Sequence, residues 1–67
     1  MAQISKVYKH IKSGHIVRVI DIARLQTVHP TSHLRDMEPM VVYVHAGATW
    51  VRAESEFDDG RFELITN

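Results

Sequence analysis

The fold is decided by the stretch Val41–Phe62, VVYVHAGATWVRAESEFDDGRF. β-branched and aromatic residues, which favour strands, occur here in short runs separated by glycine-marked turns. We expect strands at Met40–His45 and Thr49–Ala53, joined by the connection 46–48. A helical turn at Glu54–Phe57, with its phenylalanine inward, should lead through the turn 58–60 into a last strand, Arg61–Ile65, with Phe62 and Leu64 inward.

Two further strands are expected on the N-terminal side of this stretch. Ile4–Ile11 reads as a short, partly exposed strand, and the turn Lys12–His15 follows it because Gly14 can adopt a positive φ without steric cost. Ile16–Leu25 is rich in β-branched residues, and its apolar residues change parity near Asp21, which predicts a β-bulge there. A helix over 17–25 is the competing interpretation of this segment.

The segment Gln26–Pro39 is polar and irregular, and we expect it to form a long flexible loop. Pro30 lacks the amide hydrogen that a strand ladder needs. Thr31 or Ser32 could cap one helical turn that ends before Pro39. A loop of this length in so small a domain is where we expect mobility or function.

These elements predict an all-β protein with the architecture of a small SH3-like barrel, made of about five short antiparallel strands with one helical turn before the last. The 67 residues form one domain, 1–67. The chain has no cysteine, which excludes disulfides and thiolate zinc sites. No apolar run has the roughly 18 residues of a membrane span, and the N-terminus has no signal-peptide pattern, so we expect a cytoplasmic protein.

The net charge is zero but unevenly distributed along the chain. Residues 1–35 hold six basic residues and one acidic residue, a net of +5, whereas residues 36–67 hold two basic and seven acidic residues, a net of −5. The simpler interpretation is that N-terminal strands pair beside C-terminal strands, so that the charges offset one another. The alternative is a basic face that binds a polyanion.

Several short motifs, taken together, resemble a family of small bacterial and phage proteins known as domain of unknown function sixteen fifty-three. The motifs are Tyr-x-His-x-Lys-x-Gly at 8–14, Ala-Arg at 23–24, Val-Val-Tyr at 41–43, Trp-Val-Arg at 50–52 and Phe-x-x-Gly-Arg-Phe at 57–62. The chain departs from the family pattern at Ala53, where members often have proline, and in the length of the loop 26–39. The resemblance implies a small β-barrel of bacterial or phage origin, with no catalytic residues to carry over.

The sequence does not predict an enzyme, a cofactor or a metal site. No serine lies in a nucleophile-elbow context, and the three glycines are isolated. His29 and His33 have the spacing of a metal pair on a helix, but Pro30 lies between them and no third ligand has suitable spacing. The other three histidines are expected on strand surfaces.

One group of residues is a candidate binding face, because small barrels often gather aromatic and basic side chains on an open surface. Its members are Tyr8, His10, Lys12, Tyr43, Trp50, Arg52 and Arg61. The simpler interpretation is that Trp50 and Tyr43 fill or rim a small core, and that Arg52 could stack on Trp50 as a cation–π pair without any ligand.

We therefore expect a non-enzymatic binding or adaptor module for a protein partner. A nucleic-acid or nucleotide-binding module that uses the basic N-terminal half and the aromatic residues is the second hypothesis. A homodimer that covers an edge strand is the third.

Overall fold

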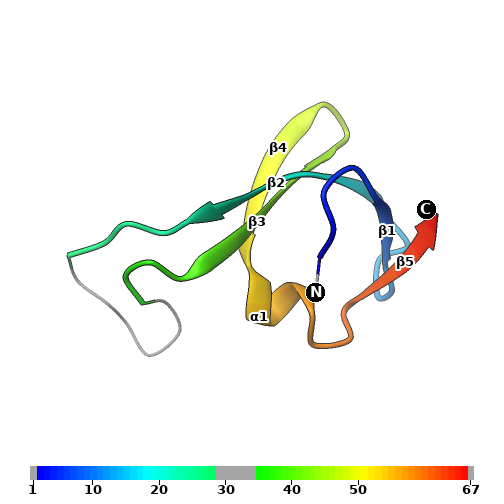
Figure 1. Cartoon of the computed structure of the whole chain (residues 1–67). Helices are drawn as coiled ribbons and strands as arrows, with labels where there is room; N and C mark the ends of the chain where they lie inside the picture. Colours follow the sequence, from blue (N-terminus) through cyan, green and yellow to red (C-terminus); the bar gives the residue numbers. More distant parts are fainter. Residues whose placement is uncertain (1, 29–34, 67) are drawn as a thin grey trace.

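The computed structural model describes residues 2–28 and 35–66. The described chain forms a five-stranded antiparallel sheet with one helical turn (Figure 1). The elements are β1 (Val7–His10), β2 (Ile16–Arg24), β3 (Pro39–His45), β4 (Ala48–Ala53), α1 (Glu54–Phe57) and β5 (Phe62–Thr66). The predicted all-β class and the helical turn before the last strand are confirmed, and the competing helix over 17–25 is wrong.

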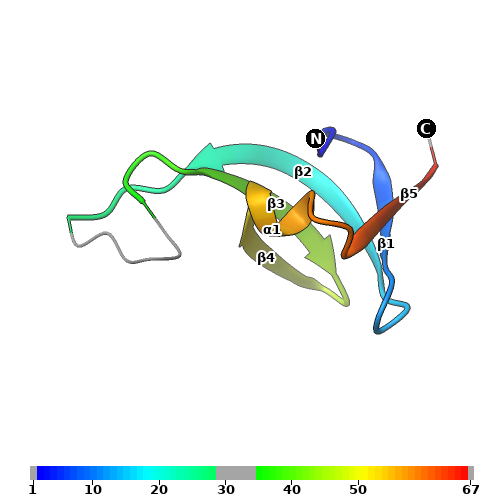
Figure 2. The same ribbon diagram turned by 90° about the horizontal axis from the view of Figure 1, so that it is seen from below.

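The sheet curves like a barrel but is not closed (Figure 2). Its strand order is β4-β3-β2-β1-β5, so β4 and β5 are the two edge strands. Within the described residues no backbone ladder joins these edges. A side-chain contact between them is the guanidinium of Arg52 in β4, which lies over the ring of Phe62 in β5. We call this junction between β4 and β5 the seam.

The bulge predicted near Asp21 is confirmed. In the pairing of β2 with β3, Val19 lies opposite Tyr43 and Asp21 lies opposite Val42, so Ile20 is the extra residue. The bulge moves the buried face from odd to even positions: Val19 is fully buried before it, and Ile22 packs against the core after it. One inserted residue therefore lets this nine-residue strand face a single core along its length.

The core is built around Phe57, whose ring stacks on Phe62 at 4.1 Å between centroids and meets the edge of Tyr8 at 5.1 Å. The predicted inward position of Phe57 is confirmed, and Phe62 packs against the core as expected. Leu64 was also predicted inward, but it is 40% exposed because β5 is an edge strand with no neighbour on its outer side. The buried apolar side chains that form the cluster are Ala2, Tyr8, Val17, Val19, Val41, Tyr43 and Phe57.

The first predicted strand is shorter than expected. Ser5 has a φ of +71°, which ends the extended conformation on the N-terminal side of β1. Ser5 and Lys6 are still hydrogen-bonded to the middle of β2. The Ser5 amide donates to the Val19 carbonyl oxygen at 2.8 Å, and the Val19 amide donates to the Lys6 carbonyl oxygen at 3.0 Å. These bonds bring Ala2 into the core.

The predicted loop 26–39 extends too far at its C-terminal end, because Pro39 is the first residue of β3. At this position the missing amide hydrogen of proline costs no ladder hydrogen bond. The described parts on either side of residues 29–34 continue the β2–β3 hairpin. The Leu25 amide donates to the backbone carbonyl oxygen of Glu38 at 2.9 Å, and the Thr27 amide donates to the side-chain carboxylate of Asp36 at 2.9 Å. This arm projects from the sheet (Figure 1). The expected capped helical turn and the pair His29 and His33 lie outside the described residues.

The strand register brings the two oppositely charged halves of the sequence together at β1 and β5. These strands pair with Lys9 opposite Glu63, as the simpler charge interpretation predicted. The structure also contains no helix, among the residues described, that is long and apolar enough to cross a membrane.

Candidate binding cleft at the seam

A small cleft lies on the concave face of the sheet beside the seam. Its volume is about 90 Å³. Sites that enclose small molecules usually measure about 300–1,000 Å³, so this cleft suits one side chain better than a cofactor. Residues from all five strands line it: His10, Val17, Tyr43, His45, Trp50, Arg52 and Phe62.

Trp50 forms the rim of the cleft and is positioned by the β3–β4 hairpin. It lies opposite Tyr43, and its indole N–H donates to the His45 carbonyl at 3.4 Å. Trp50 is nevertheless 51% exposed, so it does not fill the core, whereas Tyr43 is buried in it. The reason is topological: Trp50 is on the inner face, but β4 is an edge strand and no ladder with β5 covers it.

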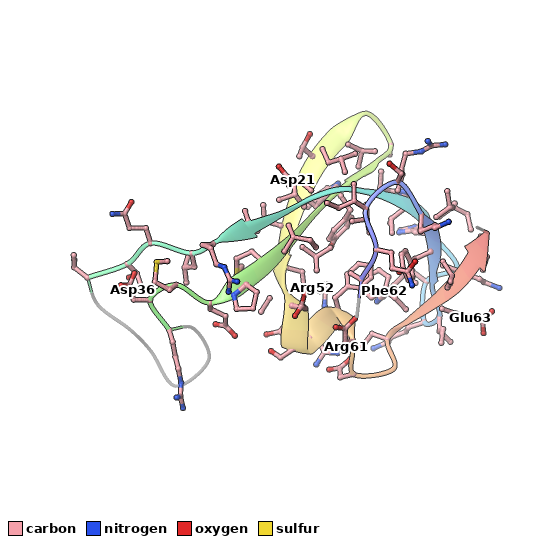
Figure 3. The ribbon with its side chains drawn as sticks, in the orientation of Figure 1. Asp21, Asp36, Arg52, Arg61, Phe62 and Glu63 are labelled. Carbon is pink, nitrogen blue, oxygen red and sulfur yellow. The ribbon has the colours of Figure 1, made fainter. Side chains whose placement is uncertain are left out.

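Arg52 forms the wall of the cleft on the same face of β4 as Trp50. Its guanidinium lies 5.4 Å from the centroid of the Phe62 ring, so Arg52 forms its cation–π pair with Phe62 and the predicted partner, Trp50, is wrong (Figure 3). One guanidinium nitrogen lies 3.9 Å from Glu56 Oε1, beyond hydrogen-bond distance. Arg52 makes no hydrogen bond within the described chain, although its side chain is only 28% exposed. The cleft therefore contains a partly buried cation with unused donors.

Two histidines also line the cleft. His45 Nδ1–H donates to the carbonyl oxygen of Ile16 at 3.0 Å, and its ring stacks on His15 at 4.4 Å. His10 lies against Phe62 at 4.9 Å between ring centroids. No carboxylate lines the cleft, so its charged and ionisable groups are one guanidinium, two imidazoles and the phenol of Tyr43.

The structure brings four of the seven predicted face residues to the cleft: His10, Tyr43, Trp50 and Arg52. Tyr8 is instead a core residue, 6% exposed, whose hydroxyl accepts the Gln3 amide at 3.0 Å. Lys12 lies exposed on the β1–β2 turn and does not line the cleft.

Arg61 is also outside the cleft. It pairs with Asp59 at 3.0 Å and with Glu56 at 3.5 Å. Sequence reasoning missed Val17, His45 and Phe62 as lining residues. His45 could have been found from strand alternation, because it is two residues from Tyr43 and therefore shares the inner face of β3 with it.

A serine–histidine contact that the sequence did not predict lies in the β1–β2 turn. His10 Nδ1 and Ser13 Oγ are 2.7 Å apart, and the same oxygen accepts the His15 amide at 3.2 Å. In the described chain no carboxylate hydrogen-bonds to His10, so the contact lacks the third group of a triad and closes the turn instead. No group of three or more potential metal ligands occurs among residues 2–28 and 35–66.

No protein-family profile, curated protein or solved structure matches this chain. The resemblance to the family of unknown function therefore stays a prediction.

Proposed function

We propose that the protein is a non-enzymatic binding module that holds an extended segment of a partner protein at the seam. The observation that carries this proposal is Trp50, a half-exposed tryptophan at the rim of an apolar cleft beside an unpaired edge strand. Tryptophan and arginine are the residues that most often dominate protein–protein binding energy, and here they lie two residues apart on one face of β4.

The free edge of β4 supports an extended ligand. An edge strand presents unpaired amide and carbonyl groups, and added strands use them for main-chain hydrogen bonds while pockets on the sheet select side chains. The cleft is small enough to select one side chain at a time. The family resemblance supports, as part of the same proposal, a bacterial or phage source. The cytoplasmic location expected from the sequence also belongs to the proposal.

Selection from a displayed library of random peptides would test this function, because it assumes no particular partner. We expect wild-type protein to enrich peptides that the Trp50→Ala variant does not retain. Since Trp50 is the only tryptophan, its fluorescence should change when the synthesised peptides are added. Failure to enrich any sequence, or enrichment of peptides that bind the alanine variant equally well, would contradict the proposal.

A matched control is available on the outer face of the same strand. Val51 is 58% exposed, on the opposite face from Trp50 and Arg52. Val51→Ala should leave the selected peptides bound. Loss of binding in this variant would show that the convex face, and not the cleft, is the interface.

A further inference from the structure

We infer that the seam selects segments in which an apolar residue and an acidic residue are separated by one position, so that the apolar side chain packs beside Trp50 and the carboxylate binds Arg52. This inference rests on the proposed function and deepens it. It concerns which peptide is bound, whereas the proposed function concerns whether a peptide is bound.

The preference for an acid comes from the unused donors of Arg52. Its side chain is 28% exposed, it stacks on Phe62, and no hydrogen bond to the described residues occupies its N–H groups. A guanidinium presents five donors in a planar fork that matches a carboxylate, and a charged hydrogen bond in a partly buried site is stronger than one in water. The absence of any carboxylate in the lining leaves the cleft complementary to an anion.

Glu56 is a weak competitor for this donor group. Its carboxylate is 3.9 Å from Arg52 and 3.5 Å from Arg61, so one acid is divided between two cations. Arg61 also holds Asp59 at 3.0 Å. An incoming carboxylate can therefore displace Glu56 from Arg52, because Glu56 retains Arg61 as its closer partner.

The spacing comes from the geometry of β4. Successive side chains of a strand point to opposite faces, so Trp50 and Arg52 are nearest neighbours on the concave face. A peptide strand added to the free edge would place alternate side chains on that same face, each opposite one of β4. Two ligand side chains can then meet Trp50 and Arg52 together only if one residue lies between them.

Short synthetic peptides test the inference directly. The probes are acetylated, amidated seven-residue peptides that carry Leu-Thr-Asp or Asp-Thr-Leu between flanking threonines, which covers both strand directions. Matched peptides replace Asp by Asn, or place Leu and Asp next to each other. Binding is measured by Trp50 fluorescence, with amide chemical shifts of β4 as the second readout. We expect one of the two spaced orders to bind at least about fivefold more tightly than its Asn counterpart and than the adjacent peptide.

Variants of the protein identify the residue that binds the acidic side chain of the peptide. Arg52→Gln should abolish the preference for Asp over Asn, whereas Glu56→Gln should tighten binding of the Asp peptide by about twofold. Asp59→Asn is the matched control, because it removes a carboxylate from Arg61 and none from Arg52, and it should leave the affinity unchanged. The amide spectrum of the buried Val19 and Val41 reports whether each variant is folded.

The outcomes separate the two proposals. Peptides that bind with equal affinity whether they carry Asp or Asn, or whether Leu and Asp are spaced or adjacent, would overturn the inference and leave peptide binding intact. If neither these probes nor the library gives any binder, the proposed function fails, and the inference fails with it. Displacement of the peptides by a ten-residue oligothymidylate, or a Trp50 signal that changes on dilution of the protein alone, would overturn both in favour of nucleic acid or a second copy of the chain.

Discussion

At the scale of single residues, two aromatic residues of the chain, Phe57 and Trp50, have opposite roles. Phe57 is 1% exposed and contacts three other aromatic rings, whereas Trp50 is 51% exposed and contacts the hairpin through one long hydrogen bond. Removing a buried phenylalanine leaves a cavity, but removing a half-exposed ring mainly forfeits partial burial. The two residues should therefore differ in what they contribute to stability and to binding.

We expect Phe57→Ala to lower the free energy of unfolding by about 3–5 kcal/mol, and Trp50→Ala to lower it by about 1 kcal/mol. Urea denaturation followed by far-ultraviolet circular dichroism measures both, since fluorescence is lost with Trp50. If Phe57→Ala does not fold, Phe57→Leu provides a milder variant, and its free energy of unfolding should still fall by more than that of Trp50→Ala. Equal losses at the two positions would contradict the assignment of Phe57 as the centre of the core.

At the scale of elements, the β3–β4 hairpin contains a strained residue. Its two-residue loop has positive φ at both positions, +53° at Ala46 and +77° at Gly47, as type I′ hairpin turns require. Glycine adopts this conformation freely, but an alanine there costs about 1–2 kcal/mol. Asparagine tolerates a positive φ better than alanine and is preferred at the first position of such turns.

Ala46→Asn should therefore raise the free energy of unfolding by about 1 kcal/mol and make the hairpin that carries Trp50 more stable. Ala48→Asn is the matched control, because Ala48 is also exposed but lies in the extended β4. Asparagine disfavours strands, so this control should not be more stable than the wild type. Thermal denaturation of the three proteins measures these differences in stability. An unchanged melting midpoint in Ala46→Asn would show that the turn stores no strain.

The elements also show how far the sequence predicts this fold. The change of apolar parity near Asp21 predicted the bulge, because a strand must keep one face on the core. The acidic helical turn with its inward Phe57 was also predicted from the sequence. The exposure of Trp50 and Leu64 was not predictable from alternation, which identifies the inner face of a strand but not whether a neighbouring strand covers it. The cleft exists because the ladder stops at two edges, and that depends on the curvature of the whole sheet.

At the scale of the whole molecule, folding offsets part of the uneven charge of the sequence. Lys9 of the basic half lies opposite Glu63 of the acidic half in the β1–β5 ladder. Lys12 lies exposed on the β1–β2 turn and makes no ion pair within the described residues. A nucleic-acid binder needs several unopposed cations on one surface, because each phosphate that is contacted releases a counterion. The register of β1 against β5 works against such a surface.

We accordingly expect a fluorescent single-stranded oligonucleotide to show no salt-sensitive binding, even at low ionic strength. Fluorescence anisotropy measured over a series of salt concentrations is the readout, with the Lys9→Glu/Lys12→Glu double variant as the comparison. Because Lys9 already faces a carboxylate, the double variant should behave like the wild type toward the oligonucleotide. Binding that weakens steeply with salt, and is lost in the double variant while its urea midpoint is unchanged, would assign the basic N-terminal half to a polyanion and would favour nucleic acid over protein as the partner.

Binding that weakens with salt but persists in the double variant and is lost in Arg52→Gln would instead place the nucleic acid in the cleft, where Trp50 and Arg52 could stack on a base.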